Sequence, residues 1–220
     1  MDHISMDTLV FLKELKANNE RDWFDANKKR YKQAQDGLIA FVDSLLPALS
    51  KLDKTIKGVE AKKAVFRIYR DVRFSHDKSP YKTNMGAHVH AGAKNDSQAG
   101  FYFHIEPGNC FLAGGAYSPP GPWIKAIRKE IYHNAAPLKK ILASASFKNY
   151  FGEMEGESLK TSPRDYDADH PEIELLRRKS FLAVHKVKDS QVTKRGYTTH
   201  CTNVFTVLSP FNAYLNMALD

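Results

Sequence analysis

Hydrophobic positions in the first quarter of the chain recur at the spacing of an α-helix. Leucines three residues apart precede a polar stop at Asn18 and Asn19, and the same period continues through residues 31–52. Pro47 lies within this second run, and because proline lacks a backbone donor we expect it to kink or end the helix. The pattern predicts a helical hairpin over residues 1–53, with its apolar stripe facing the core.

The middle of the chain changes to the two-residue period of β-strands. The segment VFRIYRDVRF at residues 65–74 alternates and is rich in β-branched and aromatic residues. The same signal recurs, between glycine-containing turns, at residues 85–91, 101–106 and 110–117. These segments predict a small, largely antiparallel sheet, in which the pair Gly114 and Gly115 marks a bulge or a close backbone approach.

Helical periodicity returns after the predicted sheet. Gly121 and Pro122 begin one helix, because proline is tolerated in a first turn that needs no backbone donor, and a second helix runs through Leu138 and Leu142. The rest of the chain is predicted, in order, as a loop with a short strand at 158–170, a short helix at 171–178, a strand at 180–187 and a helix at 200–219.

No linker or internal repeat divides these elements, so we expect one domain over residues 1–220. The helical hairpin at 1–53 precedes a region of sheet and helices at 60–187, and the helix at 200–219 follows it. The predicted fold class is α+β: a small, largely antiparallel central sheet with helices from both termini packed around it.

Composition narrows the class of protein. The chain has 220 residues, of which 42% are hydrophobic and 26% charged, values typical of a globular protein. Two cysteines, Cys110 and Cys201, are too few for a disulfide framework or a four-cysteine zinc site, which indicates a reducing compartment. The first residues do not form a signal peptide and no apolar run is long enough to span a membrane. We therefore expect a cytoplasmic protein with no membrane partner.

The net charge of +8 is concentrated in two segments. Residues 60–82 hold seven basic and three acidic residues, and residues 177–195 hold seven basic residues and one acidic residue. Clustered positive charge raises the local concentration of anions more than scattered lysines do. We therefore expect an anionic ligand, with phosphate or nucleic acid as candidates, although the same charges also suit a solvated surface.

The predicted strand at 65–74 carries candidate chemistry. Its alternation places Arg67, Tyr69, Asp71 and Arg73 on one face. On that face the two arginines would keep Asp71 ionised and still present donors to a phosphate or a carboxylate.

Arg70 interrupts the otherwise apolar opposite face of the same strand. A guanidinium on a buried face needs a carboxylate partner, because an unpaired buried charge is costly. We expect Glu106, Asp165 or Asp167 to be that partner.

The loop that follows, at residues 75–84, is dense in groups that bind anions or transfer protons. The candidate catalytic residues are Asp71, His76 and Asp77, because carboxylate and imidazole groups act in general acid–base catalysis. The candidate ligand-binding residues are Arg67, Tyr69, Arg73, Lys78, Tyr81 and Lys82. The nucleotide-binding patterns GxxxxGK[ST] and GxGxxG do not occur, and we expect no cofactor.

Histidines at strand spacing give a weaker alternative. His88 and His90 share one strand face, and His104 and Glu106 share a face of the next strand. If the strands pair in register, these four groups would suit a divalent transition metal. The spacing is not specific, however, so exposed histidines and no metal are the main expectation.

Several motifs together carry a family resemblance. They are DWFDANKKRY, RDVRFSHDKSPYKT, AGFYFHIEPGNCFLAGGAYSPP, IKAIRKEI and LKTSPRDYDADHPEIELLRRKSF. In this order they resemble the domain-of-unknown-function 2461 family over nearly the whole chain, with RDVRFSHDKSPYKT as the most specific part. The resemblance implies a mostly bacterial, soluble, single-domain protein, and it supplies no functional residues that can be transferred to this chain.

Two classes of function follow from these observations. The first is recognition of an anionic ligand, phosphate-bearing or carboxylate, in a basic cleft built on residues 66–84, with an enzymatic role left open. The alternative is a non-catalytic interaction module whose basic segment docks an acidic protein partner.

Overall fold

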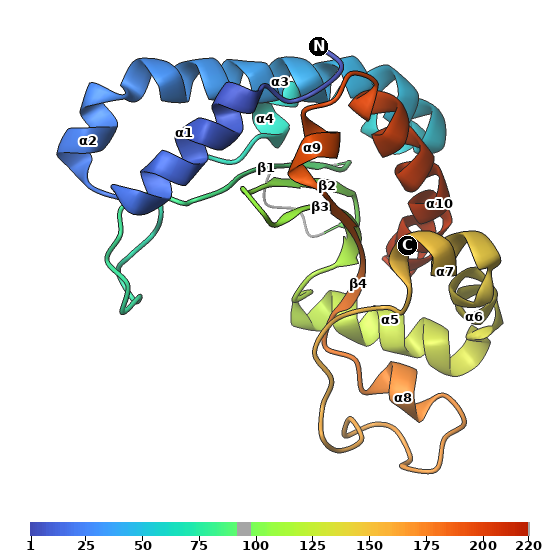
Figure 1. Ribbon diagram of the computed structural model, residues 1–220. Helices are drawn as coiled ribbons and strands as arrows, with labels where there is room; N and C mark the ends of the chain where they lie inside the picture. The colour runs from blue at the N-terminus through green and yellow to red at the C-terminus, as the bar shows by residue number, and fades with distance from the viewer. Residues whose placement is uncertain (92–97, 220) are drawn as a thin grey trace. The chain divides into compact units, whose positions relative to one another are not determined.

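The computed structural model of the protein describes residues 1–91 and 98–219. These residues form an α+β fold, with helices and a four-stranded antiparallel sheet whose strand order, β1-β2-β3-β4, follows the chain (Figure 1). The predicted fold class is confirmed. Each strand pairs with its neighbour in sequence, although several helices separate the last two strands along the chain.

The N-terminal helices replace the predicted hairpin with three α-helices and two short turns of helix. Their bounds are α1 Met6–Ala17, α2 Arg21–Ala26, α3 Lys28–Leu52, the 3₁₀ helix η1 Lys54–Ile56 and α4 Ala61–Ala64. Ser5 caps α1, because its side chain accepts a hydrogen bond from the Asp7 backbone N–H. Pro47 lies inside α3 and does not end it, so the helix continues to Leu52.

The sheet matches the predicted strands to within a few residues. Its strands are β1 Met85–Val89, β2 Phe101–Ile105, β3 Cys110–Ala116 and β4 Phe181–Val187. In β2, Phe101, Phe103 and Ile105 are at most 1% exposed. Because side chains alternate along a strand, residues 102 and 104 point to the opposite face.

The C-terminal half is mostly helical, as predicted, with two additional short helices. Its helices are α5 Gly121–Asn134, α6 Ala136–Ala143, α7 Ala145–Phe151, α8 Ile173–Leu176, α9 Asp189–Val192 and α10 Tyr197–Met217. The short α7, which the periodicity did not reveal, is capped by the Ser144 side chain. Over the part of the chain that the structure describes, no helix combines the length and the apolar character needed to cross a membrane.

The predicted strand at 65–74 is wrong. Residues in this segment form only isolated bridges, from Val65 to Ala87 and from Tyr69 to Tyr81. The alternation predicted that Phe66 and Phe74 lie on a buried strand face. In the structure Phe66 is 39% exposed and Phe74 is 95% exposed, so this face is not buried. The segment has strand-like composition but lacks a neighbouring sheet face to bury it, and packing rather than composition decides strand formation.

The chain divides into two compact units, neither of which is continuous in sequence. One consists of Met1–Val89, Tyr102–Leu112 and Lys186–Asn203, and the other of His90–Phe101, Ala113–His185 and Val204–Asp220. In the first unit α1 lies alongside α3 (Figure 1). There the Phe41 ring of α3 packs edge-on against Phe103 of β2, at 6.0 Å between ring centroids, and stacks on Tyr197 at 5.4 Å.

The second unit has its own core, built on α5, α7 and α10. The Phe205 ring of α10 lies 5.0 Å from Phe101. The buried Trp123 indole donates a hydrogen bond of 3.0 Å to the carbonyl oxygen of Leu215, so its polar atom is satisfied. Helices from the C-terminal region therefore cover this part of the sheet, as the predicted architecture requires.

Gly115 is the tightest backbone position of the second unit. It has φ +112°, and a Cβ there would lie 2.0 Å from the carbonyl oxygen of Phe181 and 2.9 Å from the Phe211 ring. The neighbouring Gly114 is also crowded, with a Cβ position 2.6 Å from the Gly100 carbonyl oxygen. The close backbone approach predicted for this glycine pair is confirmed.

We expect Gly115→Ala to destabilise the fold by about 3 kcal/mol or more, because left-handed strain adds to a backbone clash that no side-chain movement relieves. Gly108→Ala is the matched control, since Gly108 also has positive φ (+78°) but meets no atom within 4 Å. Its expected loss is about 1–2 kcal/mol. Chemical denaturation of both variants measures the difference, and equal losses would contradict the role of the close approach.

Candidate functional site

Residues 65–84, which we call the arm, connect α4 to β1 and lie wholly in the first unit. Figure 1 shows the arm as two limbs that extend beyond α1. The limbs are joined by backbone hydrogen bonds from Arg70 to Pro80, at 2.9 Å, and from Lys82 to Ile68, at 2.8 Å. The arm therefore returns on itself and brings Arg67 and Lys82 back to the same end.

The base of the arm is held by Asn19 and Phe24. The Asn19 amide donates to the Tyr81 carbonyl oxygen at 2.9 Å and accepts from the Tyr81 N–H at 3.1 Å. The Tyr81 ring stacks on Phe24 with 3.9 Å between centroids, and the Tyr69 ring packs nearby. Tyr81 is only 5% exposed, so its ring belongs to the packing of the arm's base.

Two ion pairs take up two of the five cations of the arm. Arg73 donates to both oxygens of Asp71, from Nε at 3.0 Å and from Nη2 at 2.7 Å. Arg70 pairs with Asp77 and also donates to the Ser79 carbonyl oxygen. The expected partners of Arg70, namely Glu106, Asp165 and Asp167, are therefore wrong, because the arm turns back and supplies an acid seven residues along the chain.

These pairs hold both carboxylates ionised. Hydrogen bonds from the Arg73 side chain and backbone lower the pKa of Asp71 to about 2. Hydrogen bonds from the Ser79 hydroxyl and N–H, together with the Arg70 guanidinium, lower the pKa of Asp77 to about 2. So weak a base is poorly matched to general-base catalysis near neutral pH, and the catalytic roles of Asp71 and Asp77 stay predictions.

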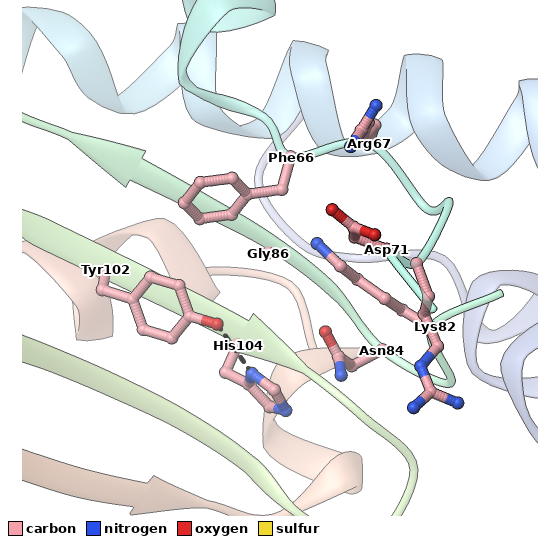
Figure 2. Close-up of a pocket in the computed structure, with 9 residues that line it drawn as sticks. Phe66, Arg67, Asp71, Lys82, Asn84, Gly86, Tyr102 and His104 are labelled. Carbon is pink, nitrogen blue, oxygen red and sulfur yellow. Dashed lines mark hydrogen bonds between the residues drawn. The ribbon is translucent and has the colours of Figure 1, made fainter. Parts of the chain in front are cut away.

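A cavity of about 460 Å³ lies between the arm and strands β1 and β2 of the same unit, and we call it the basic pocket. Figure 2 shows the Lys82 side chain and the Tyr102 hydroxyl directed into the space between its walls. The pocket is lined by Phe66, Arg67, Arg70, Asp71, Lys82, Asn84, Gly86, Tyr102 and His104.

Two cations of the basic pocket are not neutralised. Within residues 1–91 and 98–219, neither Arg67 nor Lys82 forms a salt bridge. The Lys82 ammonium lies 5.5 Å from the centroid of the Phe66 ring, a cation–π contact. Burial lowers the pKa of Lys82, and the nearby charge of Arg67 lowers it further. A ligand that brings negative charge to this wall would therefore relieve an unfavourable arrangement of like charges.

The opposite wall carries a hydrogen-bonded chain of three side chains. The Tyr102 hydroxyl lies 2.9 Å from Nδ1 of His104, and Nε2 of His104 lies 3.4 Å from a carboxylate oxygen of Glu106. Asn109 donates to the same Glu106 oxygen at 2.9 Å. The His104 ring also stacks on Phe111, at 4.3 Å between centroids. The imidazole is thus fixed in plane and in direction.

Burial and hydrogen bonds shift the pKa values of Tyr102, His104 and Glu106. Burial lowers the pKa of His104, which favours the neutral imidazole, and it raises the pKa of Tyr102 to about 12. Burial alone would raise the pKa of Glu106, but hydrogen bonds from Asn109 and His104 outweigh it and lower that pKa. An ionised Glu106 favours the proton of His104 on Nε2, which leaves Nδ1 to accept from Tyr102.

Gly86 is one of the residues that line the basic pocket. A Cβ at this position would lie 3.0 Å from the Tyr102 hydroxyl oxygen and 3.0 Å from the Phe103 carbonyl oxygen. A side chain here would crowd the hydroxyl, so glycine keeps that oxygen accessible from the pocket.

The structure gathers only part of the predicted site. Arg67, Asp71 and Lys82 line the basic pocket. A smaller cavity of about 260 Å³ beside it is lined by residues that include Asp77, Tyr81 and Lys82.

The other predicted residues lie outside both cavities. Arg73, His76 and Lys78 are exposed, and the Lys78 ammonium donates to the Val72 carbonyl oxygen. Tyr69 is 46% exposed at the arm's base. Ligand-binding and catalytic roles for these residues stay predictions.

The four-residue metal hypothesis gains no geometric support. Among the described residues, no group of three or more His, Cys, Asp or Glu side chains could hold a metal ion. His104 and Glu106 lie together as their spacing predicted, whereas His88 and His90 do not join them in such a group. Nδ1 of His90 lies 2.6 Å from the Ala91 carbonyl oxygen.

Five residues of the pocket were not predicted as site residues: Phe66, Arg70, Asn84, Gly86 and Tyr102. For Tyr102 a signal was present, because residues 102, 104 and 106 alternate on one strand face. A tyrosine two positions before a paired histidine and glutamate extends that polar row. For Asn84 and Gly86 the position depends on where the arm ends, which the periodicity does not show.

Comparisons with known proteins agree with the motif order. A profile for conserved hypothetical proteins of domain-of-unknown-function 2461 matches residues 7–214. A search of curated proteins gave no match, and neither did a search of solved structures.

The bidentate pair with Arg73 predicts that Asp71 stays ionised down to about pH 2. Since the pKa is lower in the folded than in the unfolded protein, the pair stabilises the fold at neutral pH, and this contribution is lost as the pH falls through that value. Carboxyl ¹³C NMR titration should place the Asp71 midpoint near 2, and Arg73→Met should raise it, because the side-chain hydrogen bonds are lost while the one from the backbone N–H remains. Asp77 serves as the internal control, because Arg73→Met should leave its midpoint unchanged. A normal Asp71 midpoint in the unmodified protein would contradict the ion pair.

Proposed function

The chain belongs to the DUF2461 family of conserved hypothetical proteins, and from the geometry of its basic pocket we propose that it binds an anionic ligand, phosphate-bearing or carboxylate, at Arg67 and Lys82. The observation that carries this proposal is the imbalance of charge in the pocket. Asp71 and Arg70 have ion-pair partners, whereas neither Arg67 nor Lys82 forms a salt bridge among the described residues, although the charge of Asp71 in the same pocket interacts with Arg67. Two positive charges thus face one pocket.

The remaining walls suit the rest of such a ligand. Phe66 and Tyr102, with 6.3 Å between their ring centroids, offer apolar surface beside the cations, and the Asn84 amide offers both a donor and an acceptor. Small-molecule sites commonly combine apolar walls with a few polar groups that fix orientation. The pocket therefore suits a ligand with a charged group and an adjoining organic part.

A second candidate function is the docking of an acidic protein partner on the arm. The observation that favours it is Phe74, which is 95% exposed beside the Arg73 guanidinium, 5.9 Å from its ring. Exposed aromatic and arginine side chains are typical of protein interfaces. Phe74→Ala should weaken such a partner's binding and leave anion binding in the pocket unchanged.

Isothermal titration with inorganic phosphate and with pyrophosphate at low ionic strength tests the proposed function. Lys82→Met and Arg67→Met should each weaken binding about tenfold or more, because each removes a charge-assisted hydrogen bond to the anion. Lys125→Met is the matched control, since Lys125 is exposed on α5 and lines none of the cavities described above. No binding by the unmodified protein, or equal losses in all three variants, would refute the site.

Removal of the Asp71 charge should change the phosphate affinity in the opposite direction, which gives a second test. Asp71 lines the pocket, so Asp71→Asn removes a negative charge from the wall and frees Arg73. We expect this variant to bind phosphate several-fold more tightly, with a steeper loss of affinity as salt rises. Titration at two salt concentrations measures both effects, and weaker binding by Asp71→Asn would contradict the placement of the anion.

A further inference from the structure

We propose that the basic pocket hydrolyses phosphate diesters, with Tyr102 taking a proton from the attacking water and passing its own proton to His104. This proposal rests on the anion site at Arg67 and Lys82. It adds a reaction to that site, and it assigns a catalytic role to a tyrosine on β2.

The first step of the argument is the direction of the hydrogen bonds. The ionised Glu106 favours the tautomer with the proton on Nε2, which lies 3.4 Å from its carboxylate, and in that tautomer Nδ1 accepts from the Tyr102 hydroxyl, 2.9 Å away. In this state the lone pairs of the Tyr102 oxygen stay available to the pocket. The arrangement is that of a hydroxyl, an imidazole and a carboxylate in sequence, which activates hydroxyl groups on unrelated folds.

The second step is the support behind the imidazole. His104 is 9% exposed and its ring is stacked on Phe111, so its orientation is fixed. Glu106 accepts from Asn109 at 2.9 Å and lies 4.0 Å from the Lys16 ammonium. An imidazolium formed at His104 would be stabilised by the Glu106 carboxylate, as a base that gains a proton requires.

The third step is the position of the hydroxyl relative to the cations. Tyr102, Arg67 and Lys82 line the same cavity, and Figure 2 shows the Tyr102 hydroxyl and the Lys82 ammonium on opposite sides of its interior. Gly86 keeps the hydroxyl uncovered, because any Cβ there would lie 3.0 Å from it. A phosphate held by the cations would therefore face the hydroxyl across the pocket, with room for a water molecule at its surface.

The chemical step balances with water as the only co-reactant. The water oxygen forms a bond to phosphorus while its proton moves to the Tyr102 oxygen, and the Tyr102 proton moves to Nδ1 of His104. The bond from phosphorus to the leaving oxygen breaks, and that oxygen keeps the electron pair. The proton on His104 returns through Tyr102 to solvent when the products leave.

Charge selects diesters over monoesters. A phosphate diester carries one negative charge, and attack by a deprotonating water brings a second charge into the transition state. Two unpaired cations match that transition state better than the ground state, which is the condition for rate acceleration. Monoesters react through a looser transition state that gains little from a base, so they should be poor substrates.

The test uses bis(p-nitrophenyl) phosphate in the presence of EDTA, followed by release of p-nitrophenolate. The full chain should turn over this diester faster than p-nitrophenyl phosphate. Tyr102→Phe, which keeps the ring, and His104→Gln, which keeps a polar group but cannot take the proton, should each lower kcat about 100-fold or more. Both variants should keep the affinity for inorganic phosphate within about twofold, which separates loss of chemistry from loss of the site.

A single-stranded oligonucleotide provides a second arm of the same experiment. Its cleavage, with the same dependence on Tyr102, would place the substrate among nucleic acids, whereas cleavage of the small ester alone would place it among small diesters. Lys125→Met serves again as the control for protein quality and charge.

Three results would overturn the proposal. These are phosphate binding without turnover of the diester, turnover that survives Tyr102→Phe, and turnover that needs an added divalent metal. Absence of phosphate binding by the unmodified chain would refute the anion site itself, so the two failures are distinguishable.

Discussion

The alternation of side chains along β2 is the constraint on which both the core and the candidate site depend. Phe101, Phe103 and Ile105 point to one face of the strand and are almost fully buried. The same backbone therefore has to place residues 102, 104 and 106 on the other face. Since α3 packs against Phe103 of β2, a shift of the strand by one residue would expose the core and break the row from Tyr102 to Glu106. The register of this strand therefore determines both the stability of the core and the geometry of the site.

The number of basic residues in the arm overstates the positive charge that is available to a ligand. The arm contains several cations, but its own acids take up Arg70 and Arg73, and Lys78 donates to a backbone carbonyl. What is left for a ligand is the pair that the returning limbs bring together, Arg67 and Lys82. Local pairing therefore leaves two neighbouring cations in a broadly basic segment, and the proposed anion site rests on this arrangement.

The sequence was most informative where periodicity and burial act together. The sheet strands and the helices could be predicted because each buries one regular face, and the glycine pair in β3 could be identified as a close approach. The arm could not, because VFRIYRDVRF has the composition of a strand but the arm is held by distant residues: Phe24 packs against Tyr69, and Asn19 bonds to the Tyr81 backbone 62 residues later. The prediction of the partner of Arg70 was wrong for the same reason, because that partner is set by a turn within the arm and not by strand alternation. Arg67, Asp71 and Lys82 were predicted as neighbours, whereas Asn84 and Gly86 depended on where the arm joins β1.

The two hydrogen bonds between the Asn19 amide and the backbone of Tyr81 have a consequence for how this chain can vary in length. They hold the return limb as a neighbouring strand would, at a point just before Lys82. Residues 74–76, at the outer end of the arm, lie beyond both ion pairs and beyond this attachment. Because Lys82 directly follows this attachment, we expect its position to depend on Asn19 more than on the length of the outer end of the arm, where a longer loop costs little entropy.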